Sequence, residues 1–464
     1  MAKITFLGAT GTVTGSRFLL QTDRQNLLID CGLFQGLKKL RQRNWEPFRF
    51  PPAQIDRVFL THAHIDHTGY LPRLCRDGFH GKVHCTHATR DLCDILLRDS
   101  GHLQEEDARW ANKKGFSKHI PALPLYGVED AEAALDLFEP RHYGEHLKLD
   151  DQTRVKFKDA GHILGSSFVD IKRTVNGRSR KIFFCGDFGR PERPVLNDPA
   201  QAYNVDYLVL ESTYGNRLHG QVDAKAELTK VIKQSVRRGG VLVVPAFSVG
   251  RTQTLLYLIR ELQEEGALQD IPVYVDSPMA IKTTELFDKY IHDMDLAARV
   301  QALQGKRIFH PANVKFCPTV KESKSINEIK GRAIIISASG MVTGGRILHH
   351  MMHRLPQKQN TILFIGYQAE GTRGRLMLDG ARTIKIHGQQ VPVHAKIEQI
   401  DGFSGHPDSN EIVAWLMGVN VKPETAFIVH GEADSSAALA LRIREKLGWN
   451  VEVPEFGQSF ELDL

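Results

Sequence analysis

Residues 61–67 read Thr61-His62-Ala63-His64-Ile65-Asp66-His67, so three imidazoles and one carboxylate fall within six positions. The apolar residues 58–60 come directly before them and predict a strand. The polar side chains therefore lie at a strand end, where a rigid sheet can aim them at one point. Imidazole and carboxylate groups are ligands that zinc accepts, and a set without cysteine is typical of an open hydrolytic site. The stretch predicts a catalytic metal centre.

Further ligand-type residues follow other apolar runs of the chain. Six of them come at or just after a short β-type run: Asp30, His162, Asp187, Glu211, His406 and His430. Strand ends of one sheet share one edge of a fold, so we expect these side chains to converge with residues 62–67. Any one of them alone is compatible with a solvated turn, and it is their repetition that favours a shared site.

The composition is that of a soluble globular protein with more than one domain. Its 464 residues are 42% hydrophobic and 25% charged, and the length exceeds a single ordinary core. No apolar run is long enough to span a bilayer, and the N-terminal residues enter a strand directly. We therefore expect a cytoplasmic protein without a membrane partner. The six cysteines form no CxxC pair and are interpreted as reduced thiols. The net charge of +6 is compatible with a polyanionic partner without demanding one.

The pattern of strands and helices changes twice along the chain. Residues 86–97 and 103–114 predict two helices among the strands of the N-terminal part. Between residues 213 and 385, near-continuous apolar strands alternate with helices, which is typical of a mostly parallel sheet covered on both faces. Short strands return after residue 385. The sequence therefore predicts an α/β chain in which one domain, residues 1–212 and 386–464, is split by an inserted α/β domain, residues 213–385.

Glycine-rich turns of the inserted part are candidates for phosphate binding, because backbone N–H groups of small residues at a helix start form an anion site. The candidate residues are Arg251, Ser337, Ser339, Gly340 and Arg373. Each such turn alone is a weak signal, and ordinary turn chemistry is the alternative. His349 and His353 lie four positions apart on a predicted helix. Because no third ligand accompanies them, we interpret them as solvated or packed side chains.

The assembled motifs resemble those of the metallo-β-lactamase fold and, within it, the β-CASP ribonucleases, the group of the cleavage and polyadenylation endonuclease subunit and ribonuclease J. The resemblance spans nearly the whole chain and is nearest to the short bacterial or archaeal type. Four lactamase motifs correspond to Asp30, residues 62–67, His162 and Asp187, and three further motifs to Glu211, His406 and His430. The resemblance implies an αββα sandwich split by an inserted β-CASP domain, and a zinc-dependent nuclease of RNA processing or decay.

The resemblance also implies a role for each residue. His62, His64 and His162 would hold one Zn²⁺, Asp66, His67 and His430 would hold a second, and Asp187 would bridge the two. Two dications about 3.5–4 Å apart need a shared anionic ligand and can clamp a phosphate oxygen. Asp30 would orient a ligand histidine, and Asp66 could also act on the nucleophile. His406, oriented by Glu211, would protonate the leaving 3′ oxygen.

Three alternatives to a ribonuclease stay open at this point. DNA-processing relatives tend to carry Val at the last motif, so His430 favours RNA over DNA as the substrate. A non-catalytic RNA-binding scaffold is disfavoured because such relatives lose ligands that this chain keeps. A small-molecule hydrolase is disfavoured because a small ester needs no inserted domain as a cover. Internal and end-directed cleavage are both compatible with the sequence, as are a monomer and a homodimer.

Overall fold

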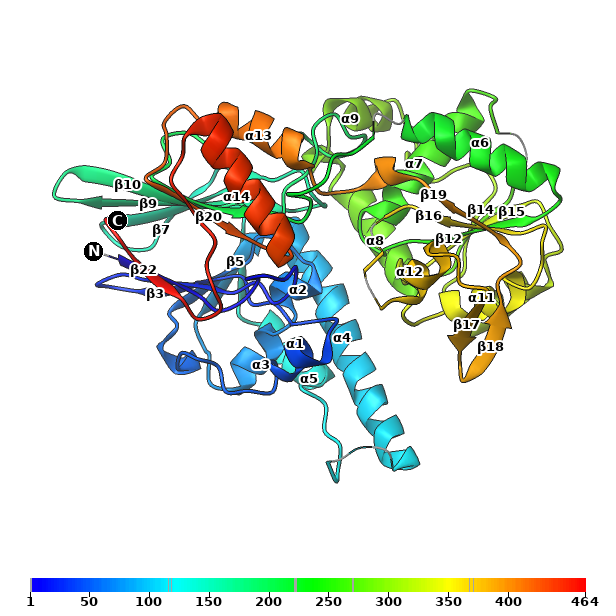
Figure 1. Cartoon of the computed structure of the whole chain (residues 1–464), viewed down its shortest axis with the longest axis horizontal. Coiled ribbons are helices and arrows are strands. Elements are labelled where there is room, and N and C mark those ends of the chain that lie inside the picture. The colour runs from blue at the N-terminus through cyan, green and yellow to red at the C-terminus, as the bar shows by residue number, and fades with distance from the viewer. Residues whose placement is uncertain are drawn as a thin grey trace. The chain divides into compact units, whose positions relative to one another are not determined.

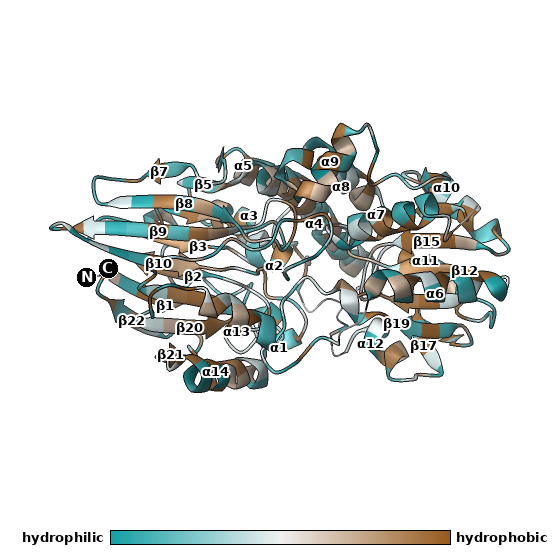
Figure 2. Ribbon diagram, turned by 90° about the horizontal axis from the view of Figure 1, so that it is seen from above, coloured by the Kyte–Doolittle hydropathy of each residue, from teal (hydrophilic) through white to brown (hydrophobic). Residues whose placement is uncertain are grey.

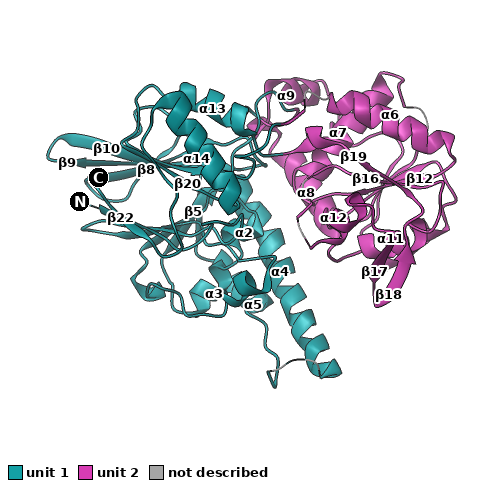
Figure 3. Cartoon of the chain, in the orientation of Figure 1, with its two compact units in different colours: residues 1–193, 197–218, 405–464 teal, residues 194–196, 219–404 magenta. Residues whose placement is uncertain are grey.

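The computed structural model describes residues 2–115, 117, 119–220, 223–268, 271–366, 368–369 and 371–464. The chain forms two compact units (Figure 1, Figure 3). Unit 1 comprises residues 1–193, 197–218 and 405–464, and unit 2 comprises residues 194–196 and 219–404. In the described part of the chain, no helix combines the length and the apolar character needed to cross a bilayer.

Unit 1 contains two seven-stranded sheets, each with parallel and antiparallel pairs. The first, in the order β22-β1-β2-β3-β4-β5-β6, consists of β1 (Ala2–Phe6), β2 (Phe18–Gln21), β3 (Asn26–Ile29), β4 (Arg57–Phe59), β5 (Lys82–Thr86), β6 (Phe138–Arg141) and β22 (Ser459–Leu462). The second, in the order β21-β20-β11-β10-β9-β8-β7, consists of β7 (His146–Lys148), β8 (Thr153–Asp159), β9 (Ser167–Val175), β10 (Arg178–Phe184), β11 (Tyr207–Glu211), β20 (Thr425–Val429) and β21 (Val451–Glu452). Strands from the C-terminal part of the chain therefore complete both sheets.

The two sheets pack face to face over one hydrophobic core. Phe6 and Phe18 of the first sheet share this core with Phe184 and Phe427 of the second, and the ring centroids of Phe6 and Phe427 are 5.2 Å apart. Helices α13 (Ser409–Met417) and α14 (Ala433–Leu447) cover the outer face of the second sheet. The helices beside the first sheet are α2 (Ile65–Thr68), α3 (Leu71–Arg76), α4 (His87–Lys114) and α5 (Val128–Leu135) (Figure 1). Unit 1 is thus the αββα sandwich that the sequence predicts.

A single helix, α4, stands where the sequence predicts separate helices over residues 86–97 and 103–114. Gly101 lies between the two predicted segments, and glycine weakens an isolated helix. In the structure Gly101 is buried against the turn that starts α5, where a Cβ atom would lie 2.7 Å from the carbonyl oxygen of Gly127. Close packing therefore stabilises the helix at Gly101, a position where the local sequence disfavours a helix.

Unit 2 is built on a six-stranded sheet whose neighbouring strands are all parallel. Its order is β14-β13-β15-β12-β16-β19, with β12 (Val241–Pro245), β13 (Val273–Val275), β14 (Val314–Phe316), β15 (Ala333–Ser337), β16 (Thr361–Phe364) and β19 (Lys396–Gln399). The main helices are α6 (Ala224–Arg237), α7 (Arg251–Glu264), α8 (Pro278–Lys289), α9 (Leu296–Leu303), α11 (Ile347–Arg354) and α12 (Arg373–Leu378). Figure 2 shows β15 as an apolar strand, in keeping with burial on both faces.

The limits of unit 2 differ from those of the inserted domain predicted at residues 213–385. Strand β19 pairs with β16 and so belongs to the parallel sheet, and unit 2 extends to residue 404. At its other end, the break with unit 1 falls at residue 219. A short strand of mixed polarity fits either sheet, so the residues of β19 alone do not indicate which sheet it joins.

Candidate metal centre

One group of loops in unit 1 carries the ligand-type residues of the sequence. Asp30 follows β3, His62 and His64 follow β4, and Asp66 and His67 lie on the short helix α2. The others follow or end strands of the second sheet or precede α13. Three groups have ligand atoms within 4.8 Å of one another: His62, His64, His162 and Asp187; Asp66, His67, Asp187 and His430; and Asp187, Glu211 and His406. The folded chain thus brings together side chains from the N-terminal and the C-terminal segments of unit 1.

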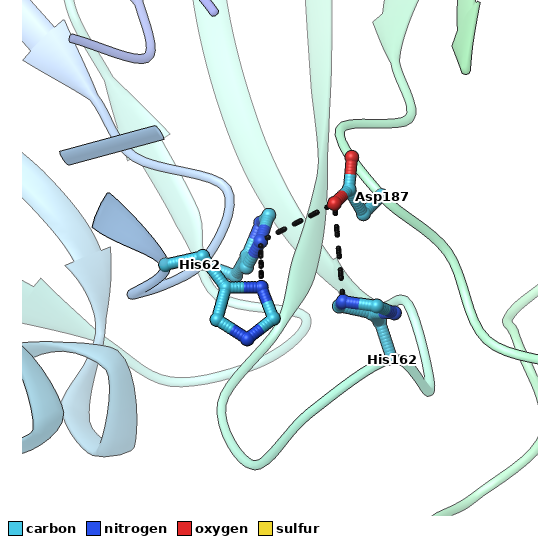
Figure 4. A group of neighbouring side chains, drawn as sticks. His62, His162 and Asp187 are labelled. Atoms are coloured by element: carbon cyan, nitrogen blue, oxygen red, sulfur yellow. Dashed lines mark hydrogen bonds and ion pairs between the residues drawn. The ribbon is translucent and has the colours of Figure 1, made fainter. Parts of the chain in front are cut away.

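Asp187 belongs to all three groups, and each of its oxygens faces a different pair of imidazoles. Its Oδ2 lies 3.6 Å from Nε2 of His62 and 3.8 Å from Nε2 of His162. Figure 4 shows one oxygen of Asp187 between these two rings. Its Oδ1 lies 3.2 Å from Nε2 of His67 and 3.1 Å from Nδ1 of His430. This division is the one expected of a carboxylate that bridges two cations.

The donor atoms of these groups fit zinc. Nε2 of His62 lies 3.0 Å from Nδ1 of His64, and Nε2 of His67 lies 3.2 Å from Nε2 of His430. Ring nitrogens that face each other compete for one proton, whereas converging lone pairs suit a cation. Asp66 adds a carboxylate oxygen 3.3 Å from Nε2 of His430. Nitrogen and oxygen donors without sulfur are a set that catalytic zinc uses.

Burial and neighbouring charges place His62, His64 and Asp187 in the protonation states that bind metal. Burial, reinforced by His67, lowers the pKa of His62 well below its usual value, and burial lowers the pKa of His64 to about 4. Burial opposes ionisation of Asp187, but the imidazoles of His430 and His67 outweigh it and hold the pKa of this carboxyl well below its usual range. Neutral imidazoles and an ionised carboxylate are the forms that ligate a metal ion. At His67 burial is outweighed by the carboxylates of Asp187 and Asp30, which raise the pKa of this imidazole well above its usual value in the absence of a metal ion.

Asp30 supports the centre from the end of β3. It is fully buried, its Oδ2 accepts a hydrogen bond from Nδ1 of His67 at 2.8 Å, and its Oδ1 accepts one from the Thr61 N–H at 2.8 Å. The first contact orients the His67 ring so that Nε2 faces the group. Asp30 and His430 have φ angles of 58° and 48°, in a region that residues other than glycine rarely adopt. The surrounding structure stabilises these strained backbone conformations at the centre.

Glu211 and His406 form a pair beside Asp187. Glu211 is 1% exposed, and its Oε2 accepts hydrogen bonds from Nδ1 of His406 at 2.9 Å and from the Thr213 hydroxyl at 2.6 Å. The N–H of Phe188 donates to Oε1 of Glu211 at 2.8 Å. The His406 side chain is 18% exposed. With Nδ1 donating to Glu211, proton exchange by His406 would take place at Nε2.

Two hydroxyl groups at the centre were not identified from the sequence. Oγ of Ser16 lies 3.3 Å from Nε2 of His67, and Oγ1 of Thr213 lies 3.3 Å from Nδ1 of His430. Serine and threonine are common in loops, and neither residue belongs to a ligand-type spacing. Only the folded contacts associate them with the metal centre.

The candidate phosphate-binding residues lie in unit 2, and two of them are engaged with the protein backbone. Ser337 is buried, and its hydroxyl donates to the carbonyl oxygen of Asp276 at 2.9 Å. Arg373 donates from Nε to the carbonyl oxygen of Lys385 at 2.8 Å and from Nη1 to those of Val342 and Thr343. These contacts show that Ser337 and Arg373 brace the turn, and their contact with phosphate stays a prediction.

The other three candidates occupy the starts of turns or helices. Arg251 is the first residue of α7. Ser339 is half-buried, with its hydroxyl 2.8 Å from that of Thr343. Gly340 is buried, and a Cβ atom there would lie 2.8 Å from the ring of Phe247. Of the glycine-rich turn between residues 366 and 375, Tyr367 and Glu370 lie outside the described residues.

A network of ion pairs and hydrogen bonds surrounds Asp276, next to the turn between β15 and α11. Asp276, which follows β13 and is fully buried, accepts from Nη1 of Arg346 at 2.8 Å, Nε2 of His350 at 2.7 Å and Oγ of Ser323 at 2.7 Å. Arg346 also donates to the carbonyl oxygen of Cys317 at 2.7 Å. Histidines 349 and 353, on either side of His350 along α11, are exposed. Asp276 therefore connects strand, turn and helix.

Three family models match the chain. Residues 11–218 match the metallo-beta-lactamase superfamily, residues 252–377 match the Beta-Casp domain, and residues 390–454 match the Zn-dependent metallo-hydrolase RNA specificity domain. The first match contains the residues 62–67, the second falls within unit 2, and the third includes His406 and His430.

Curated proteins resemble the chain along nearly its whole length. It is 35% identical to Ribonuclease TTHA0252 of Thermus thermophilus, across 98% of this chain and 99% of that protein. It is 30% identical to an RNase J-like protein of Methanocaldococcus jannaschii, across 98% and 99%. It is 32% identical to Transcription termination factor FttA of Pyrococcus abyssi, across 97% of this chain and 70% of that protein.

Among solved structures, a protein of unknown function from Enterococcus faecalis V583 aligns with 99% of the chain at a TM-score of 0.54 and 11% sequence identity, which shows a shared fold. The curated relatives match at higher identity, and the family models match the regions that contain the clustered ligands and the parallel sheet. The chain belongs to the metallo-β-lactamase superfamily, as a member with β-CASP and RNA specificity domains.

Proposed function

We propose that this protein is a ribonuclease that hydrolyses RNA phosphodiester bonds with two zinc ions. The observation that carries the proposal is the position of Asp187, whose two oxygens face separate pairs of imidazoles. His62, His64 and His162 would hold one ion, and Asp66, His67 and His430 would hold the other, with Asp187 shared between them.

The chain's own residues complement the metal chemistry. Zinc bound here supplies a Lewis acid for the phosphate and lowers the pKa of bound water to about 7. Asp30 keeps the His67 ring in place through its Nδ1. Asp66, whose side chain is 19% exposed, is the carboxylate that could also act on the attacking water molecule besides holding a metal ion.

His406 is the proposed donor to the leaving 3′ oxygen. Glu211 holds Nδ1 of the ring at 2.9 Å, which fixes the ring and leaves Nε2 for the proton that is transferred. The buried Glu211 is itself fixed by the Phe188 N–H and the Thr213 hydroxyl. The pair therefore acts as an oriented acid beside the bridging carboxylate.

RNA is the substrate that the relatives and the chain's chemistry favour. Residues 390–454 match an RNA specificity domain, and a relative that aligns with 98% of the chain is named a ribonuclease. Arg251, Ser339 and Gly340 are the proposed contacts to backbone phosphates, with Ser337 and Arg373 bracing their turn. All six cysteines are free thiols, which fits our proposal of a cytoplasmic protein.

Digestion of one RNA labelled at either end tests the proposal directly. Substrates with a 5′-triphosphate, a 5′-monophosphate and a 5′-hydroxyl are compared with DNA of the same sequence, using protein with zinc and protein treated with a chelator. We expect zinc-dependent cleavage of RNA and little cleavage of DNA, and the product lengths distinguish internal from stepwise cutting. Equal cleavage of DNA, or RNA cleavage that persists without metal, contradicts the proposal.

Replacing the bridging carboxylate gives a second test. Asp187→Ala is expected to lose bound zinc and at least about 10³-fold in cleavage rate, while its far-ultraviolet circular dichroism stays that of the folded protein. Asp170→Ala is the matched control, because Asp170 is a buried carboxylate of the same sheet that pairs with Lys158 and Lys181 outside the centre. Full activity in Asp187→Ala would refute the two-metal proposal.

A further inference from the structure

Residues 36–49 form a cationic surface segment. It follows the loop that comes after β3 and includes the short helix α1 (Lys38–Gln42). We call it the basic segment. It contains one acidic residue, Glu46, and five cationic ones: Lys38, Lys39, Arg41, Arg43 and Arg49. Four of the five are exposed, and Arg43 is half-buried. Two apolar side chains of the segment are also exposed, Leu37 at 61% and Trp45 at 55%.

The cations of the basic segment lack carboxylate partners. Among the described residues, none of the five forms an ion pair, although Glu46 lies in the same segment. Elsewhere in unit 1, exposed arginines such as Arg109 and Arg178 pair with a carboxylate, of Glu106 and Asp463 respectively. A run of unpaired positive charge raises the local potential and attracts a polyanion.

The loop between β3 and the basic segment is hydrogen-bonded to the loop that carries the metal ligands. The Leu33 N–H donates to the carbonyl oxygen of Ile65 at 2.9 Å, and the Cys31 N–H donates to that of His67 at 2.7 Å. Asn44, which is buried, ties the far side of the segment back to Phe34 through hydrogen bonds of 2.8 and 3.0 Å. The residues that lead into the segment are therefore anchored at the metal centre, and Asn44 holds the segment in a defined position next to them.

Two guanidinium groups of the basic segment are preorganised on one ring. Arg43 and Arg49 both lie over Phe456, at 4.1 and 4.3 Å from the ring centroid. Ring contacts of this kind orient an arginine without neutralising it. Its N–H groups stay available to phosphate oxygens, which the planar guanidinium binds in a bidentate manner.

We propose that the basic segment is a binding platform for single-stranded RNA next to the metal centre. Lys39, Arg41 and their neighbours would bind successive phosphates, and Trp45 would stack on a base. Repeated cations interleaved with an exposed aromatic side chain are what a single strand requires, because every nucleotide offers one phosphate and one π-face. This inference rests on the proposed ribonuclease function and assigns part of its substrate path.

The test compares two double variants that remove the same charges. Lys39→Gln/Arg41→Gln alters the basic segment, and Arg154→Gln/Lys172→Gln removes one Lys and one Arg, both exposed and unpaired among the described residues, from β8 and β9. Binding of a fluorescent phosphorothioate RNA to the full zinc-loaded protein is measured by anisotropy over a range of salt concentrations. Hydrolysis of bis(p-nitrophenyl) phosphate, a diester too small to reach the platform, is measured in parallel.

We expect the platform variant to bind RNA several-fold more weakly, with unchanged hydrolysis of the small diester. The slope of log affinity against log salt should become shallower by about 1.4, because each phosphate contact to a single strand contributes about 0.7. The β8–β9 variant should keep the wild-type affinity and slope. Equal affinities and slopes for the two variants overturn the platform. A wild-type chain that binds no RNA overturns the ribonuclease proposal as well.

Substitution of the aromatic residue tests base stacking separately. Trp45→Ala should weaken RNA binding at least about five-fold, and Trp45→Phe should restore most of it, because a phenyl ring also stacks on a base. The salt slope should not change in either variant, since no charge is removed. Wild-type affinity in Trp45→Ala would contradict the assignment of Trp45 to the platform.

Discussion

For His406, the roles of proton donor and metal ligand predict opposite effects of substitution on zinc content. It lies within reach of Asp187 and is held by Glu211, so its geometry allows either role. We predict that His406→Ala keeps its zinc, measured by plasma mass spectrometry, and loses about 10²- to 10⁴-fold in turnover number, because a general acid is removed. Loss of one zinc ion in this variant would instead identify His406 as a ligand.

A companion variant separates orientation from proton donation. Glu211→Gln keeps an acceptor for Nδ1 of His406 and removes the negative charge. It should therefore retain zinc and lose less turnover than His406→Ala. A variant as slow as His406→Ala would show that the charge of Glu211, and not only its position, is needed.

The residues of the centre differ in how readily they can be identified from the sequence. Residues 62–67 were identified because four ligand-type side chains are adjacent in the chain, so their clustering needs no knowledge of the fold. His430 was grouped with them by its position after a predicted strand, but its role as a ligand came only from the resemblance, because it follows a strand of the other sheet. Ser16 and the network of Asp276 and His350 were missed, because their roles depend on contacts of 3.3 and 2.7 Å that only folding creates.

At the scale of elements, Asp276 is the connection between β13, the turn after β15 and α11. It is fully buried, and its oxygens accept from Arg346 and His350. We predict that Asp276→Ala lowers the free energy of unfolding of unit 2 by about 3 kcal/mol, because it removes the carboxylate that the half-buried Arg346 and the buried His350 both contact. Urea denaturation followed by circular dichroism measures the change.

The control for this prediction is an exposed carboxylate of the same unit. Asp379 is 54% exposed and pairs with Arg375 four residues earlier. Its replacement by Ala should change the unfolding free energy by less than about 1 kcal/mol, because solvent screens such pairs. Similar effects of the two substitutions would show that the Asp276 network does not support the sheet.

Elements with a clear periodic pattern were predictable, and elements decided by packing were not. The strands β12 and β15 are buried on both faces and were identified as a parallel core. The continuity of α4 past Gly101 was not predictable, because it depends on the approach of Gly127 from a distant turn. The membership of β19 was missed for the same reason, since its partner β16 is fixed only by the folded sheet.

At the scale of the whole molecule, the metal ligands all lie in unit 1, and unit 2 has its own core. We predict that a chelator lowers the melting temperature of one calorimetric transition by about 5 °C or more and leaves the other unchanged. A ligand at 100 times its Kd stabilises the native state by about 2.7 kcal/mol, and in a domain of this size 1 kcal/mol shifts melting by about 2–4 °C.

The variant Asp187→Ala provides the control for that measurement. Its metal-sensitive transition should already lie at the lower temperature and should not respond to the chelator. If both transitions of the wild-type protein move together, the two units do not unfold independently, and the assignment of the metal effect to unit 1 is wrong.

The positions of the ligands along the chain also bear on how the enzyme is made. Ribosomes synthesise proteins from the N-terminus, and His62, His64 and Asp66 emerge early, whereas His406 and His430 come after the whole of unit 2. A nascent chain that ends before β20 also lacks His430, which belongs to the same group of ligands as Asp66 and His67. The messenger RNA being translated is itself a potential substrate of the product. Placing the proposed acid His406 and the last ligand His430 beyond the insertion delays completion of the nuclease until most of its own message has been read.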